Sequence, residues 1–242
     1  SGEAKQWDIS QDLSALPSGV TYDPDSLTLT LNGANLTWLN FHDFYDQAVH
    51  LVVEGSNTIT GETNALNFGN CGNVALSGSG TLNLTANEYP FGWHDYNGAT
   101  AADYNTDGVL TIRELTLNCT NLRTQAPEGH TDEEWNFFTP ITLAGGNIHI
   151  TDNAKLTCEG LGFIGVSGDL VVDGGAVVNG TGLHCNPWGN ANEEAALISP
   201  SVTVAEGGTV NLYGGGRILA NHNLLWLSPN SSLILDGEKV VG

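Results

Sequence analysis

The sequence has very few basic residues. Only six of its 242 residues are lysine or arginine, against 27 aspartate and glutamate, so its formal net charge is −21. This balance argues against nucleic-acid binding, because the chain has almost nothing with which to neutralise phosphates. It equally argues against attraction to an anionic membrane surface. We expect partners that are neutral, cationic or bridged by a divalent metal ion.

The sequence also lacks long apolar runs and has few cysteines. No apolar stretch is long enough to span a bilayer, which predicts a chain without membrane insertion. The spacing of Cys71, Cys119, Cys158 and Cys185 fits neither a zinc site nor a CxxC redox motif. Cys119 and Cys158 occupy apolar positions of strand patterns, which is typical of small buried thiols. One disulfide among the four cysteines is the alternative.

Pairs of short strand patterns recur along the chain. In residues 72–84, Val74, Leu76, Leu82 and Leu84 alternate with polar residues on either side of a Gly-rich corner. Similar units start at residues 108, 146, 168, 200 and 222, and the shortest spacing between starts is 22 residues. Coils of roughly 20–25 residues that hold short strands are typical of a β-solenoid. An antiparallel β-sandwich is the main alternative.

A solenoid buries its apolar faces by stacking one coil on the next. Asn, Ser and Thr at the corners are then expected to form ladders between coils. Residues 1–26 do not follow the repeat and are predicted to form an N-terminal cap. No linker is visible, so we predict one all-β domain over residues 1–242.

Four segments exceed the length of a bare coil and hold most of the aromatic residues: 38–47, 87–107, 123–139 and 184–194. Insertions in a solenoid emerge at one or two edges and often bind ligands. Their aromatic rings can stack on sugars or anchor a protein partner, or can pack down onto the coil edge. As a set they predict a binding surface, with these candidates: Trp38, Phe44, Tyr45, Trp93, His94, Tyr96, Trp135, Phe137 and Trp188.

Residues 103–114 match the calcium-loop pattern D-x-[DN]-x-[DN]-G-x5-E at every specified position. Alternating side-chain oxygens can converge on one hard cation, and a backbone carbonyl adds a ligand. The flanking patterns are strands rather than helices, which argues against an EF-hand and places Glu114 at a corner. An ordinary Asx-rich turn is the alternative. The candidate calcium ligands are Asp103, Asn105, Asp107, Val109 and Glu114.

Signals for catalysis are weak. Residues 105–108 (Asn-Thr-Asp-Gly) resemble one motif of the polygalacturonase-type glycoside hydrolases, but the Asp-Asp, Gly-His-Gly and Arg-Ile-Lys motifs of that family are missing. A lyase needs a basic residue beside calcium, and the scarcity of Lys and Arg argues against one. The seven histidines follow no metal-binding spacing, and no nucleophile-elbow motif supports a catalytic triad.

Several stretches resemble a known family. Residues 16–23 (Leu-Pro-Ser-Gly-Val-Thr-Tyr-Asp), 27–34, 54–61 and 168–175 resemble coils of surface proteins from gut Firmicutes. That family is described as carbohydrate-binding-domain-like β-helices and is related to calcium- and pectin-binding β-helices of clostridia. The resemblance covers most of the chain, although the long aromatic segments depart from it. It implies an extracellular protein without catalysis, secreted or attached to a bacterial cell surface.

Together these observations predict a single right-handed parallel β-helix that acts as a non-catalytic binding and adhesion module. The favoured ligand is a polysaccharide or the glycan of a host glycoprotein, with calcium as the cofactor to test. One alternative is a binder of a host protein such as an immunoglobulin or mucin, because acids interleaved with aromatics suit a basic or mixed epitope. Further alternatives are a polysaccharide lyase or hydrolase and a structural spacer.

Overall fold

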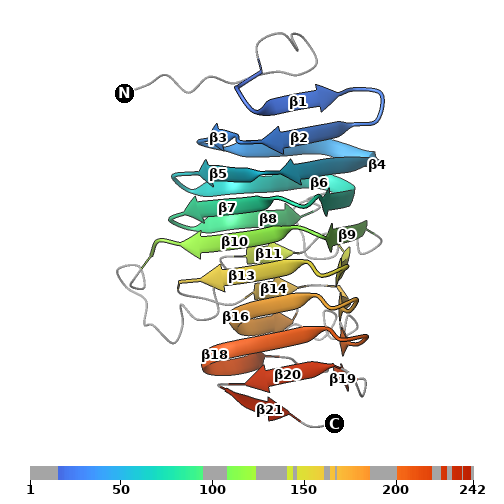
Figure 1. Cartoon of the computed structure of the whole chain (residues 1–242), viewed down its shortest axis with the longest axis vertical. Coiled ribbons are helices and arrows are strands. Elements are labelled where there is room, and N and C mark those ends of the chain that lie inside the picture. The colour runs from blue at the N-terminus through green and yellow to red at the C-terminus, as the bar shows by residue number, and fades with distance from the viewer. Residues whose placement is uncertain are drawn as a thin grey trace, which may run out of the picture.

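The fold is all β. The computed structural model describes residues 16–94, 108–123, 141–143, 146–160, 164–166, 168–185, 201–219, 225–227, 231–235 and 237–240. In these ranges the chain forms strands, turns and bends, and no helix long and apolar enough to cross a membrane is found there. Figure 1 shows the strands lying one above another along the long axis of the molecule.

The strands pair in three columns, and within each column every strand is parallel to the next. The first column consists of β2 (Thr28–Asn32), the second parts of β4 (Leu39–Glu54) and β6 (Asn64–Ser77), β9 (Gly108–Arg113), β12 (Gly146–Thr151), β15 (Leu170–Val172), β17 (Val202–Val204) and β19 (Leu225–Leu227).

The second column consists of β3 (Asn35–Leu36), β5 (Ser56–Thr60), β7 (Thr81–Ala86), β10 (Thr116–Asn121), β13 (Lys155–Glu159), the first parts of β16 (Val177–Cys185) and β18 (Thr209–Leu219), and β20 (Ser232–Leu235). The third column consists of the first parts of β4 and β6, β8 (Tyr89–His94), β11 (Ile141–Leu143), β14 (Ile164–Val166) and the last parts of β16 and β18.

The chain visits the first, second and third columns in the same order each time, and we call one such passage a circuit. The predicted pairs of strands are confirmed in the first two columns. A full circuit has three strands instead of the two that the repeat indicated. Two strands of the third column, the first part of β4 and β8, lie in segments predicted to be insertions.

Two strands run against the others, one at each end. β1 (Val20–Asp23) pairs antiparallel with β2, and β21 (Glu238–Val240) pairs antiparallel with β20. β1 therefore covers the edge of the first column, and β21 covers the edge of the second. Residues 1–15 of the predicted N-terminal cap lie outside the described residues.

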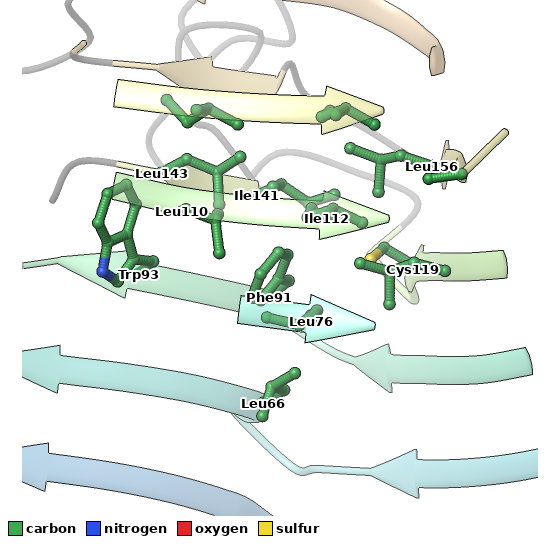
Figure 2. Packing of buried hydrophobic residues seen from close by; sticks show 14 of the residues in the cluster. Leu66, Leu76, Phe91, Trp93, Leu110, Ile112, Cys119, Ile141, Leu143 and Leu156 are labelled. Carbon is green, nitrogen blue, oxygen red and sulfur yellow. The ribbon is translucent and has the colours of Figure 1, made fainter. Parts of the chain in front are cut away.

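The core lies between the columns and is built by the alternation of each strand. In β7 the inward Leu82, Leu84 and Ala86 are fully buried, while Thr81 and its outward neighbours are half-buried. The parallel register stacks inward residues on inward residues, and Figure 2 shows this packing around Leu110 and the neighbouring strands. Each fully buried aliphatic side chain contributes about 1.5–3 kcal/mol relative to an exposed one.

The corner between the first and second columns is a stacked turn. Asp152 and Asn153 have positive φ values of 52° and 59°, and the next circuit has Gly174 and Gly175 at the equivalent places. The backbone amide of Asn153 donates to the carbonyl of Gly174, with an N···O distance of 2.9 Å. Left-handed backbone favours glycine and tolerates asparagine and aspartate, which explains the residues at this corner.

Candidate functional site

The outward side chains of the second column form a surface that we call the amide–hydroxyl face. Its three rows belong to β5, β7, β10, β13, β16 and β18. The register places mostly Ser and Thr in the two outer rows, where Lys155 and Glu159 carry the only charges. The middle row is uncharged and consists of Thr58, Asn83, Asn118, Thr157, Asn179 and Asn211.

The amides of the middle row hydrogen-bond to one another along the column. Asn118 Nδ2 donates to Asn83 Oδ1 at 2.9 Å, and Asn83 Nδ2 donates to the carbonyl of Asn57 at 3.2 Å. Asn211 Nδ2 donates to Asn179 Oδ1 at 3.4 Å. Each amide has two N–H donors and two acceptor lone pairs, so the ladder orients the amides and leaves capacity for a ligand. These ladders lie in the middle of strands, whereas we had predicted ladders at corners.

Of the exposed large apolar side chains that the structure describes, three are spaced along one edge of this face, and we call them the apolar edge. Trp38 (51 % exposed), Leu122 (50 %) and Tyr213 (37 %) all lie where the chain leaves the second column, in the first, fourth and seventh circuits. Three strand spacings, or about 14 Å, separate each from the next. In Figure 1 the arrowheads of β5, β7, β10 and β13 point toward this edge.

Tyr213 is held against the face by a hydrogen bond. Its hydroxyl donates to the carbonyl of Cys158 at 2.8 Å, which lies two circuits away. Burial raises the pKa of Tyr213, and the nearby Cys158 and Glu159 raise it further. The phenol therefore stays protonated at neutral pH and keeps donating to this carbonyl.

A polar network anchors the chain where it leaves β10. Arg123 forms an ion pair with Glu88 through Nη2 and Oε1. The backbone amide of Arg123 donates to Asn121 Oδ1 at 2.8 Å, and Asn121 Nδ2 donates to the carbonyl of Glu88 at 3.0 Å. This network fixes the chain at Arg123, beside Leu122 of the apolar edge.

The predicted ligand-binding residues lie in different environments or outside the described residues. Trp38 is exposed, while Phe44 is half-buried and packs against the core. Tyr45 and His94 belong to β4 and β8, and their side chains lie outside the described residues. Four further candidates lie outside the described residues altogether: Tyr96, Trp135, Phe137 and Trp188.

The prediction is wrong for Trp93. Its side chain is 0 % exposed, and its Nε1 donates to the carbonyl of Cys71 at 2.8 Å, so the ring is not available to a surface ligand. In Figure 2 the ring lies among the core residues. The cause is that β8 is a third-column strand and not part of an insertion.

Residues 39–44 also belong to a strand, the first part of β4, so the predicted insertion over 38–47 is wrong. The Phe41 and Phe68 rings stack in the core with centroids 4.8 Å apart, and Phe68 meets Phe91 edge-on at 6.3 Å. In three segments an apolar residue precedes an aromatic residue by two positions, and a spacing of two is the period of a strand. This was the signal that the prediction missed. These aromatics form the inner wall of the third column.

The structure corrects the calcium-loop prediction in part. Glu114 lies at a corner with a φ of 66°, as expected, but β9 extends from Gly108 to Arg113 before it. Six extended residues place Glu114 about 20 Å from Gly108. Calcium ligands lie 2.3–2.6 Å from the ion, so Glu114 cannot share an ion with Asp107. Val109 lies in β9, while Asp103, Asn105 and Asp107 lie outside the described residues.

Titratable side chains also meet on the first column. His149 Nε2 lies 2.9 Å from Asp173 Oδ1, on the outward phase that we predicted for this histidine. The nearby Ser201 hydroxyl donates to Asp169 Oδ1 at 3.0 Å, and not to the histidine. Among the described residues, no group of three or more His, Cys, Asp or Glu is placed to hold a metal ion.

No model of a protein family matches the sequence, no curated protein matches it, and no solved structure matches the fold.

Proposed function

We propose that the chain is a right-handed parallel β-helix that serves as a non-catalytic module for binding a neutral polysaccharide outside the cell. The order of the three parallel columns supports the β-helix. The right-handed sense is supported by the general handedness of connections between parallel strands. The amide–hydroxyl face, bordered by the apolar edge, is the observation that carries the ligand class.

The chemistry of the face suits sugar hydroxyls. Asn amides and Thr hydroxyls both donate and accept hydrogen bonds, as sugar hydroxyls do. Trp38 at the border offers a ring on which a sugar can stack. The flat array repeats every strand spacing, about 4.8 Å, which suits a polymer more than a small molecule.

Charge favours a neutral ligand. The chain carries a net charge of −21, yet the middle row of the face is uncharged. A polyanion such as pectin would be repelled by the rest of the molecule and would need bridging cations. A free polysaccharide and the glycan of a host glycoprotein share this chemistry, and both are extracellular ligands for a bacterial surface or secreted protein.

The test is a binding assay that compares two pairs of substitutions. Thr85→Val with Thr120→Val removes two hydroxyls from the face while keeping shape and strand preference. Thr30→Val with Thr203→Val is the matched control on the first column. We expect the face variant to bind a neutral glucan or mannan at least about ten-fold more weakly, since each hydrogen bond contributes about 1 kcal/mol, and the control to bind as the parent does.

Two further arms distinguish the alternatives. Trp38→Ala should weaken binding of the same polysaccharide with little change in melting temperature, because the ring is exposed. Immobilised mucin, its deglycosylated form and immunoglobulin separate a glycan ligand from a protein ligand. Equal binding by the two Thr-to-Val variants, or capture of deglycosylated protein alone, would overturn the proposal.

A further inference from the structure

Two cysteines stack in the core of the second column. β10 and β13 are parallel neighbours, and their register places Cys119 directly beside Cys158. Both side chains face inward and are 2 % and 7 % exposed. Cys71 is also fully buried, but its register places it beside Phe44, so it has a different neighbour.

The Cα spacing of this pair lies within the range of a disulfide. Neighbouring strands lie about 4.8 Å apart, and disulfides join Cα atoms that are about 4.4–6.8 Å apart. Both cysteines carry free thiols in the structure. Because the strands are parallel and in register, both Cβ atoms leave the sheet on the same side.

The next inward residue beyond Cys158 is a glycine. Gly180 follows it in the same inward row, and a Cβ at Gly180 would lie 3.9 Å from Cys158 Cβ and 3.1 Å from Ile164 Cδ1. A Cβ at this position would therefore crowd Ile164 but would meet Cys158 at an ordinary van der Waals distance.

We propose that Cys119 and Cys158 form a disulfide when the protein folds in an oxidising compartment. A thiolate of one cysteine attacks a disulfide oxidant, RSSR, which gives a mixed disulfide and releases one RSH after protonation. The second cysteine attacks the mixed disulfide and releases the second RSH. The two protein thiols lose two electrons and two protons, and RSSR is reduced to two RSH.

The bond has to form before the strands stack. In the folded chain both thiols are shielded from an oxidant by their burial. Burial also raises the pKa of the Cys158 thiol well above its ordinary value, and the contact with Cys119 adds to this, so the reactive thiolate is rare. Once formed, the bond would join the fourth and fifth circuits and close a covalent loop from residue 119 to residue 158.

The experiment compares the same chain exported to an oxidising bacterial periplasm and produced in a reducing cytosol. Each sample is denatured in an alkylating agent, digested and analysed by mass spectrometry. We expect a linked pair of peptides containing Cys119 and Cys158 only in the periplasmic protein, with Cys71 alkylated. The melting temperature of the oxidised protein should exceed that of the reduced protein by about 10 °C.

Variants make the test specific. Cys71→Ser should keep both the linked peptides and the difference in melting temperature. Cys119→Ala should abolish both, because Cys158 then has no partner. Alkylation of Cys119 and Cys158 in the periplasmic protein, or linkage of either to Cys71 or Cys185, would overturn the proposal.

Discussion

Trp93 illustrates how a single residue changes role with its place in the fold. A tryptophan in a segment rich in aromatics indicates a surface anchor, but its position in β8 turns the ring into the core. The indole N–H is satisfied by the carbonyl of Cys71, as buried indoles require. Trp93 therefore contributes to the stability of the fold.

Substitution of Trp93 tests this role. Trp93→Phe should lower the free energy of unfolding by about 1–3 kcal/mol, because the carbonyl of Cys71 loses its buried donor. Trp93→Ala should lower it by about 3–5 kcal/mol by leaving a cavity. Denaturant titration measures both, with Trp38→Ala as the exposed control. A loss of stability for Trp38→Ala as large as that for Trp93→Ala would contradict this assignment.

Glu114 tests the calcium prediction at the residue level. If calcium binds Asp103, Asn105 and Asp107, added calcium should raise the melting temperature, and Asp103→Ala with Asp107→Ala should abolish the rise. Glu114→Gln should leave the rise unchanged, because β9 carries Glu114 away from the loop. A calcium-induced rise in melting temperature that is lost in Glu114→Gln would contradict the extended strand. A rise that persists in the double variant would assign the loop to an ordinary turn.

At the level of elements, the sequence predicted the strands of the first two columns well. The alternation around Val74, Leu76, Leu82 and Leu84 placed four side chains in the core, and all are at most 2 % exposed. In the third column, the first part of β4 and β8 were missed because segment length, rather than strand period, was used to separate coil from insertion. The amide–hydroxyl face was missed because it depends on the register between strands, which brings together residues far apart in the chain.

The corner between β6 and β7 shows how closely the circuits approach. Gly78 has a φ of 114°, and a Cβ at this position would lie 2.2 Å from the carbonyl oxygen of Val53 in the circuit before it. Both the backbone conformation and the contact with a neighbouring strand therefore require glycine.

Gly78→Ala should lower the free energy of unfolding by about 3 kcal/mol or more, because it adds a backbone clash to conformational strain. Gly33→Ala is a matched control, since Gly33 also has a positive φ (71°) but has nothing within 4 Å of the added Cβ. The control should cost only about 1 kcal/mol. Equal losses in thermal or denaturant unfolding would mean that the contact with Val53 is unimportant.

At the scale of the whole molecule, charge opposes compactness. Six basic residues leave most of the 27 acidic side chains without a partner of opposite charge, so the folded chain repels itself. We expect the melting temperature to rise by several degrees between 10 mM and 200 mM sodium chloride, because the Debye length falls from about 30 Å to below 10 Å.

A control for the salt effect is available in the ion pair of Arg123 and Glu88, which salt weakens. Arg123→Gln removes that pair and should make the stabilisation by salt slightly larger. A melting temperature that falls with salt in the parent protein would show that attractive ion pairs outweigh the net charge.

The reversed strands at the two ends have a consequence for self-association. An uncovered strand edge is a template for another chain, and β21 occupies the edge of β20 in antiparallel orientation. Removal of residues 238–242 should let the β20 strands of two copies pair antiparallel across a two-fold axis, which gives a closed dimer. Sedimentation velocity should then show a dimer for the truncated chain and a monomer for the parent. Open-ended polymers would instead mean that parallel addition to the other columns dominates.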